Sequence, residues 1–499
     1  MDCIKDRFNI TQKAFRRFMY NDLYIFGVMA LAFVAWVTKS AVTGFVLMSV
    51  IGFFALSLSD DLLPLLANLL GCVLMLYTGD ISSYLYLWPA IIPLALGLII
   101  FLVRNIICKT KAEGGFKANF KLGKFFFPLL AVALVLLLGG AGVIPIDLYI
   151  KSLPGILLLG VGILFGYLIF INFIKRDTET DYALTLGRIL VYMGLFVGIE
   201  LVITIARSQL PMSDWNNGYW ALGWAGNRNV IAHVLLFTAP MSLYMFTRST
   251  KWGWWYLAIG VFQYLCLFLT YSRGGILCGF VALFVGIIFM AVKAPNKKIG
   301  LISIGAILIV IAILAICFRD KLAVIFQNLV DRGSGTSGRT ALYKEAIEVF
   351  CKHPFLGAGM GYQGANYTPK PPIYTYWFHS TIFQVMACMG MVGLICYIVL
   401  YGSKIVILWK TRHNSFSLFA IVVWIGYEGY SLIDTGTFIP FPQQFFSLLI
   451  LIILEIINEK EDTPFIMGVY RKIKNKINEK KEAVEIPEND QDHETTTER

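Results

Sequence analysis

The sequence predicts an all-α, polytopic bundle of membrane-spanning helices with one large loop outside the membrane. The chain of 499 residues is 58% apolar and only 15% charged. Its mean hydropathy of +0.70 is far above that of soluble globular proteins. Long apolar segments also recur along the chain, and each approaches the roughly 20 residues that a helix needs to cross a bilayer.

These segments predict about 14 spans, because the apolar core of a bilayer is about 30 Å thick. Their approximate limits are 22–38, 41–58, 62–79, 83–103, 124–140, 152–174, 186–206, 228–246, 253–271, 274–292, 299–317, 381–401, 415–432 and 440–457. The early segments contain few ionisable residues and are expected to form a scaffold. Glu200 is the exception, because a carboxylate inside a span marks either a functional site or a buried partner such as an arginine.

The distribution of lysine and arginine predicts the orientation of the chain. The net charge of +11 could suggest nucleic-acid binding. In a membrane protein, however, an excess of cations marks the cytoplasmic loops, so we do not expect a nucleic-acid partner. If the N-terminus is placed inside, most of the 42 cations fall on the cytoplasmic side. We therefore expect a plasma-membrane protein with both termini in the cytoplasm and the loop 318–380 on the outer face.

Four regions are expected along the chain. They are an N-terminal scaffold at 1–207, a catalytic region at 208–402 that includes the outer loop, two further transmembrane helices at 403–458, and a cytoplasmic tail at 459–499. The tail is basic, and its first part has the apolar spacing of an interfacial helix, whereas its end has the composition of a disordered segment.

The outer loop holds the candidate catalytic residue. Of the five histidines, only His353 and His379 are expected at the outer membrane surface. His353 ends an amphipathic helix before Pro354, where a cation on the last carbonyls is ordinary capping. His379 has no such role, and it lies where the span 381–401 begins. A neutral imidazole there can accept a proton from a hydroxyl nucleophile.

Two arginines are expected on the same face. Arg273 lies in a turn too short to carry its side chain away from the membrane, and the glycines that follow it would let an anion approach the backbone. Arg339 lies in the first turn of a helix for which Ser337 is the expected N-cap, where a cation opposes the helix dipole. Two arginines and one proton acceptor suit displacement of a phosphate leaving group.

A glycine motif in the loop requires a separate interpretation. Residues 359–364 satisfy the pattern G-x-G-x-x-G, but they neither follow a strand nor open a βαβ unit. We therefore reject dinucleotide binding. Loop flexibility or close packing of the backbone against a ligand remains.

An ordered series of motifs resembles the O-antigen ligase and O-antigen polymerase family of bacterial membrane glycosyltransferases. The series is GNRNVIAHVLLFTAP, TYSRGG, SGRTALYKEAIEVFCKHPFLGAGMGYQ and FHSTIFQVMACMGMVGL, within residues 222–400. In that family two arginines and a histidine handle a polyprenyl-diphosphate-linked glycan without metal, and the motifs align them with Arg273, Arg339 and His379. Family members often have Asn directly after the histidine, where this chain has Ser380.

The resemblance implies a metal-independent and cofactor-independent glycosyltransferase, which would be inverting if the attack is direct. It would transfer a polyprenyl-diphosphate-linked glycan to an acceptor hydroxyl in cell-surface polysaccharide synthesis. The acceptor is a second lipid-linked repeat in a polymerase and a lipid core or a protein in a ligase, and both stay open. Tyr376, Trp377 and Tyr362 are candidate glycan contacts.

Two other classes are weighed against this one. A transporter or flippase of polysaccharide precursors would require ionisable residues at mid-membrane and matching broken helices. Glu200 and Glu428 are the main acidic candidates, and the sequence has no detectable repeat. A structural membrane subunit would leave the two arginines and His379 unexplained.

Overall fold

The computed structural model describes residues 13–59, 61–76, 88–112, 114–174, 181–211, 221–249, 253–317, 338–366 and 374–459, together with 319, 320, 323 and 327. Within these residues the elements are helices, apart from one isolated bridge between Leu222 and Ala225. The fold is therefore all-α, as predicted. The cytoplasmic tail expected after residue 459 lies outside the described residues.

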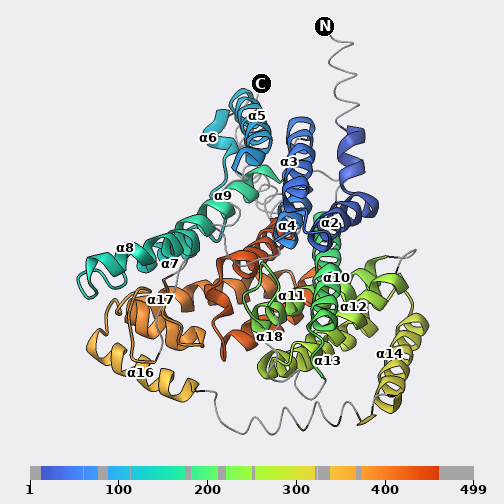
Figure 1. The fold of residues 1–499 in the computed structure, drawn as a ribbon. Helices are drawn as coiled ribbons and strands as arrows, with labels where there is room; N and C mark the ends of the chain where they lie inside the picture. Colours follow the sequence, from blue (N-terminus) through green and yellow to red (C-terminus); the bar gives the residue numbers. More distant parts are fainter. Residues whose placement is uncertain are drawn as a thin grey trace, which may run out of the picture.

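Most of the helical elements follow one another between Asp22 and Phe438. They are α2 (Asp22–Val37), α3 (Ala41–Leu58), α4 (Leu65–Leu74), α5 (Ile91–Lys111), α7 (Phe126–Leu138), α8 (Ile146–Leu157), η2 (Leu158–Gly162), α9 (Ile163–Phe173), α10 (Tyr182–Ser208), α11 (Arg228–Arg248), α12 (Gly253–Leu269), α13 (Arg273–Lys293), α14 (Lys297–Cys317), α16 (Arg339–Lys352), α17 (Thr381–Lys410), α18 (Ser415–Ser431) and η4 (Gly436–Phe438). Their arrangement can be followed in Figure 1.

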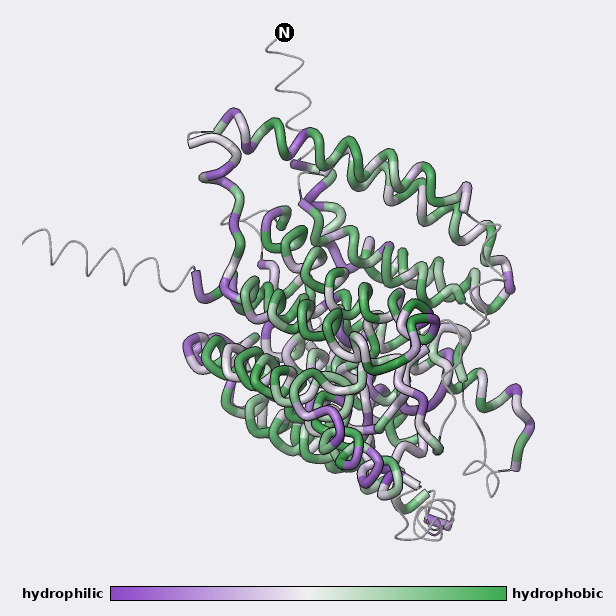
Figure 2. The backbone as a smooth tube through the Cα atoms, turned by 90° about the vertical axis from the view of Figure 1, so that its left-hand side faces the viewer, coloured by the Kyte–Doolittle hydropathy of each residue, from purple (hydrophilic) through white to green (hydrophobic). Residues whose placement is uncertain are grey.

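Eight helices in the described residues are long and apolar enough to cross a membrane, or nine if the bent pair Lys13–Met19 and Asp22–Val37 is one span. The chain is thus a multi-pass membrane protein, with fewer candidate spans than the expected count of about 14. Figure 2 shows long hydrophobic stretches along the helices, with hydrophilic residues gathered mainly at their ends and connections.

The count is lower because several apolar segments form helices shorter than a span. Helices α4, α7 and α12 have 10, 13 and 17 residues. Before α4, the apolar residues Leu62 and Leu63 are buried in a turn, where the Asp61 carboxylate accepts the backbone N–H of Leu63 at 2.9 Å. Hydropathy counts such buried turn residues as part of a span although they are not helical.

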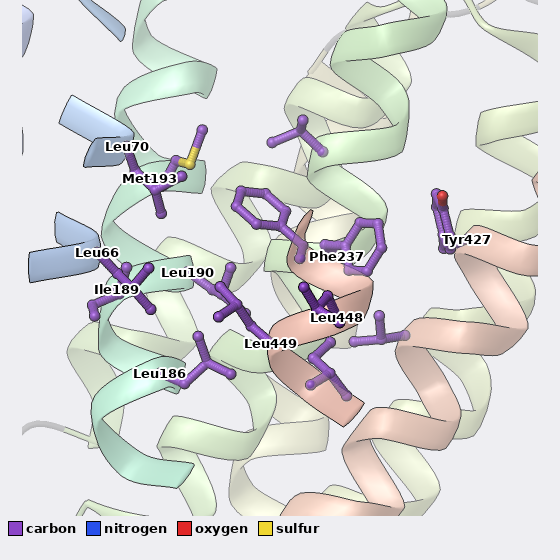
Figure 3. Close-up of a cluster of buried hydrophobic side chains, with 14 of the residues drawn as sticks. Leu66, Leu70, Leu186, Ile189, Leu190, Met193, Phe237, Tyr427, Leu448 and Leu449 are labelled. Carbon is purple, nitrogen blue, oxygen red and sulfur yellow. The ribbon is translucent and has the colours of Figure 1, made fainter. Parts of the chain in front are cut away.

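The interior is organised around α11, which packs against α10, α12, α13 and α18. Of its most apolar 18-residue window, 94% is buried inside the protein. Figure 3 shows how this core continues outward, with Leu66 and Leu70 of α4 against Ile189 and Met193 of α10. Phe237 of α11 lies in the same cluster. Because α11 is covered on nearly all sides, it has no solvent-facing polar stripe, which explains why it lacks an amphipathic pattern although it contains buried polar residues such as His233 and Ser242.

The long helix α17 is bent at Gly390, which has φ 62° and ψ −156°. The loop after α16 fills the break, because the N–H of Met391 donates to the carbonyl of Pro354 at 2.7 Å and the N–H of Val392 donates to that of Phe355 at 3.1 Å. A Cβ at position 390 would lie 2.4 Å from the Phe355 carbonyl oxygen. Only glycine fits here, and the bend joins the outer loop to α17.

Candidate functional site

A buried carboxylate, Asp434, brings two of the predicted site residues together. It follows α18 in the short connection to η4, and its side chain is 8% exposed. One carboxylate oxygen, Oδ1, lies 3.2 Å from Nδ1 of His379. The other, Oδ2, lies 3.4 Å from Nη2 of Arg339. Asp434 is not among the site residues predicted from the sequence.

Three further donors complete the surroundings of Asp434. Oδ2 accepts from Nδ2 of Asn229 at 2.8 Å and from the hydroxyl of Tyr430 at 3.3 Å, while Oδ1 accepts the N–H of Thr435 at 2.8 Å. Burial alone would raise the pKa of Asp434, but the hydrogen bond from His379 and the nearby positive charges outweigh it. They hold this pKa well below its usual value, so the group is an anion.

The contact with Asp434 fixes the role of each ring nitrogen of His379. A carboxylate only accepts hydrogen bonds, so Nδ1 carries the proton and donates it. In the neutral imidazole, Nε2 is then the nitrogen with the free electron pair. The His379 side chain is 39% exposed, whereas that of Asp434 is covered. Such an arrangement can act as an oriented base, because the second ring nitrogen belongs to an accessible side chain.

The backbone of His379 adopts an unusual conformation that its neighbours stabilise. Its φ of 52° lies in the left-handed region, which few residues other than glycine adopt. The hydroxyl of Tyr343 in α16 donates to the His379 carbonyl at 3.1 Å. The Tyr343 ring stacks on Phe383 of α17 with centroids 4.4 Å apart. Strained backbone of this kind often marks a functional site.

Arg339 reaches the site because α16 begins there. The N-cap position is Gly338, with φ 80° and no side-chain cap, whereas the expected cap, Ser337, lies outside the described residues. Arg339 and Tyr343 are four residues apart and therefore share one face of α16. That face docks on the start of α17, so a single helix carries the cation and supports the backbone of His379.

Arg273 is the first residue of α13, and its turn is tied to the same cluster. The hydroxyl oxygens of Ser272 and Tyr430 lie 2.5 Å apart, and Tyr430 in turn donates to Asp434. A Cβ added at Gly274 would lie 2.5 Å from Cδ1 of Ile433. This glycine therefore permits close packing of α13 on the end of α18, in addition to any role toward an anion.

The three candidate glycan contacts differ in exposure. Tyr376 is fully buried, and its hydroxyl donates to Oε2 of Glu345 at 2.7 Å. Tyr362 and Trp377 are half-buried, and the Tyr362 ring packs edge-on against Tyr376 at 5.4 Å. Tyr376 thus fixes the loop to α16 and has no exposed surface for a sugar in this structure. Glycan contact stays a prediction for all three.

The glycine motif packs against protein backbone. The N–H of Ala358 donates to the Ala387 carbonyl at 2.8 Å, and that of Gly359 donates to the Cys388 carbonyl at 3.0 Å. A Cβ at Gly359 would lie 2.7 Å from the Gly139 carbonyl oxygen. The start of the motif therefore packs against α17 and the end of α7, and packing of the motif against a ligand stays a prediction.

Two acidic residues outside the cluster have local partners. Glu200 in α10 is fully buried, and its Oε2 accepts from the indole N–H of Trp224 at 3.2 Å, where an arginine was one expected partner. Glu428 pairs with Lys404 at 2.8 Å. In the described part of the chain, no three His, Cys, Asp or Glu side chains lie close enough together to hold a metal ion.

The cluster around Asp434 lies partly inside a region with a family match. Residues 256–398 match the model of the O-antigen ligase family. A comparison with curated proteins gave no significant match. The matched region contains Arg273, Arg339 and His379, and it ends before Asp434. The chain is therefore a multi-pass membrane protein that carries an O-antigen ligase domain in residues 256–398.

Proposed function

We propose that the protein is an outer-face membrane glycosyltransferase that moves a glycan from a polyprenyl diphosphate to an acceptor hydroxyl. The acceptor oxygen bonds to the anomeric carbon while the bond from that carbon to the diphosphate oxygen breaks. The acceptor proton passes to Nε2 of His379, and the electron pair of the broken bond leaves with the diphosphate. Direct attack of this kind inverts the anomeric configuration.

The contact between His379 and Asp434 is the observation that carries this proposal. A sugar hydroxyl is a weak nucleophile, and removal of its proton during attack is typically worth about 10² to 10⁴ in rate. Asp434 keeps the proton on Nδ1 and stabilises the imidazolium that forms when Nε2 accepts a second proton. The exposure of the His379 side chain leaves room for an acceptor.

The two arginines supply the charge that a departing diphosphate requires. Arg339 shares Asp434 with His379, and the turn of Arg273 is tied to Asp434 through Ser272 and Tyr430. A planar guanidinium binds phosphate oxygens at two points, which a lysine cannot do. The family match over residues 256–398 supports a lipid-linked glycan as the donor.

His379→Ala tests the chemistry. The variant should keep donor binding and lose glycan transfer by about 10² to 10⁴. His353→Ala is the matched control, because His353 caps the end of α16 and should leave transfer per folded molecule unchanged. Both measurements are made on the same purified protein with a lipid-linked donor. Near-normal transfer by His379→Ala would end the proposal.

The proposed side of the membrane has a separate test. In a cysteine-free background, single cysteines introduced at Ser334 and Asn366 should react with an impermeant reagent from outside, whereas cysteines at Gly114 and Asp490 should react only after the membrane is opened. A cytoplasmic Ser334 would contradict an outer-face enzyme. Transfer should also persist in a chelator, and its loss with recovery on added metal would contradict metal-independence.

A transporter or flippase of polysaccharide precursors is the alternative class. Its main acidic candidates, Glu200 and Glu428, each have a fixed protein partner. The partner of Glu428 is a cation, whereas Glu200 accepts one hydrogen bond on Oε2 only. The pairing of His379 with Asp434 has a direct use in transfer, and this favours transfer over transport.

A further inference from the structure

A second histidine, His233, lies buried behind the Asp434 cluster. It belongs to the second turn of α11 and is 1% exposed. Nδ1 of its ring lies 2.8 Å from the backbone carbonyl oxygen of Asn229. The ring also stacks on Tyr430 of α18, with centroids 4.2 Å apart and planes at 24°. The transfer reaction proposed above assigns no role to this residue.

The contact with Asn229 holds the start of α11. A carbonyl oxygen only accepts hydrogen bonds, so Nδ1 of His233 carries the proton and donates it. The backbone N–H of Asn229 in turn donates at 2.9 Å to the side chain of Asn227, the N-cap of α11. The Asn229 backbone is therefore held at both its N–H and its carbonyl. Its side chain is directed at Asp434, whose Oδ2 accepts from Nδ2 at 2.8 Å.

The contact with Tyr430 holds a second donor to Asp434. The Tyr430 hydroxyl lies 2.5 Å from that of Ser272 and donates to Oδ2 of Asp434 at 3.3 Å. A ring stacked on another buried ring has little freedom to turn, because protein interiors are closely packed. His233 thus contacts two residues that donate to Oδ2, while the other oxygen, Oδ1, faces His379.

The surroundings of Nε2 exclude direct contact between His233 and a substrate in this structure. This nitrogen is buried and makes no hydrogen bond within the residues that the structure describes. A Cβ added at Gly436 would lie 2.2 Å from it, so η4 packs closely over the ring. The side chain of His379, in contrast, is 39% exposed. His233 can therefore act on the reaction only through its neighbours.

We propose that His233 is a positioning residue for the transfer reaction. It holds Asn229 and Tyr430 on Oδ2 of Asp434, and in this way it keeps Oδ1 directed at His379. An apolar ring would fill the same volume but could not donate to the Asn229 carbonyl. Misplacement of a catalytic group by about 1 Å can cost about 10² in rate. The inference rests on the proposed function, because it assigns His233 a part in the same reaction.

Two variants of His233 test this role in the purified full chain. His233→Phe keeps a ring on Tyr430 and loses the hydrogen bond to Asn229, so turnover per folded molecule should fall about fivefold. His233→Leu also loses the stack, and its turnover should fall about 20-fold. Donor KM should change little in both, since neither contact involves the donor. Transfer is measured with a lipid-linked donor, and size-exclusion chromatography gives the folded fraction.

Phe237→Leu is the matched control. Phe237 lies one turn further along α11, is fully buried and packs on Tyr427 of α18 with ring centroids 4.3 Å apart. The substitution removes the same kind of ring contact away from Asn229 and Tyr430. It should lower the unfolding temperature and leave turnover per folded molecule unchanged. An equal loss of turnover in Phe237→Leu and His233→Leu would make His233 a packing residue and overturn the proposal.

A double-mutant cycle with Asp434→Asn separates a role through Asp434 from an independent effect. If His233 acts through Asp434, His233→Phe should cost less than about twofold in turnover once Asp434→Asn is present. The same loss in both backgrounds, or unchanged turnover in both His233 variants, would overturn the inference and leave the proposed function intact. Near-normal transfer by His379→Ala would instead overturn both.

Discussion

Asp434 and Glu428 belong to the same stretch of chain, and each carboxylate holds a cation and a tyrosine hydroxyl. Asp434 contacts Arg339 and Tyr430, and Glu428 contacts Lys404 at 2.8 Å and Tyr401 at 2.7 Å. Their surroundings differ in access. The side chains of Lys404 and Glu428 are 6% and 16% exposed, whereas that of His379 beside Asp434 is 39% exposed.

This difference separates a structural cluster from a chemical one. Lys404 also lies over the rings of Tyr401 and Trp424, at 4.7 and 5.5 Å from their centroids. These partners of Lys404 are on α17 and α18, so the cluster ties the two helices together. The Asp434 cluster uses the same kinds of group but presents an imidazole at the surface. Under the proposed function, two similar polar networks would have different roles because a substrate can reach only one of them.

The largest effect is expected when the cluster around Glu428 and Lys404 is broken. Lys404→Met leaves the Glu428 carboxylate buried without its cation, which should lower the free energy of unfolding by about 3 kcal/mol. Thermal unfolding in detergent measures the loss, and the double variant Lys404→Met/Glu428→Gln should recover most of it. Transfer per folded molecule should stay near normal, and a selective loss of transfer would erase the distinction between the clusters.

Asp434→Asn tests the Asp434 cluster, where turnover should fall instead of stability. The amide no longer favours the proton on Nδ1 of His379 or stabilises the imidazolium, so turnover should fall by about 10²-fold with donor binding retained. Steady-state transfer and donor binding are compared with those of Glu428→Gln, which replaces the other carboxylate in the same way. Equal effects of the two substitutions on turnover would mean that access does not distinguish the clusters.

Arg339→Lys tests the role of the cation in the Asp434 cluster. The positive charge stays but the two-point contact is lost, so donor binding and transfer should weaken by about tenfold. Arg319→Lys serves as the control, because Arg319 is 84% exposed beside Asp320. Unchanged transfer by Arg339→Lys would rule out a planar contact with the diphosphate at this position.

Tyr343→Phe should have the smallest effect. It keeps the stack on Phe383 and loses only the hydrogen bond to the His379 carbonyl, worth about 1 kcal/mol or a fewfold loss of turnover. Tyr343→Leu removes both contacts and should lose more. Comparison of donor KM with turnover identifies the cause. If Tyr343 positions His379, loss of its contact should lower turnover while donor KM changes little.

Much of the fold could be predicted from local sequence. Every apolar segment marked in the sequence contains a helix, from α2 to the helix Pro442–Glu459. The number of spans could not be predicted, because buried turns such as Leu62–Leu63 have the same hydropathy as helix. Whether an apolar residue lies in helix or turn depends on backbone hydrogen bonds, and hydropathy does not record them.

Only part of the candidate site could be predicted, because local sequence does not show contacts between residues that are far apart in the chain. His379 and Arg339 stand out locally, whereas Asp434 acquires its role from partners far away in sequence, such as Asn229. One signal was present. The predicted topology puts the short connection between the segments 415–432 and 440–457 on the same face as His379, and Asp434 is its only acidic residue. A lone acid in such a connection merits testing as a partner of a nearby histidine.

The bend at Gly390 has a consequence for how the protein tolerates mutation. Its φ of 62° and its contact with the Phe355 carbonyl leave no space for a side chain. A saturation library at position 390, selected for folded protein, should therefore return glycine alone. The neighbouring outward residues Met391 and Val392, which are 47% and 40% exposed, should accept most apolar substitutions. Variation along α17 is thus expected to be lost at Gly390, which has no contact role in the Asp434 cluster but shapes the helix that begins directly after His379 and Ser380.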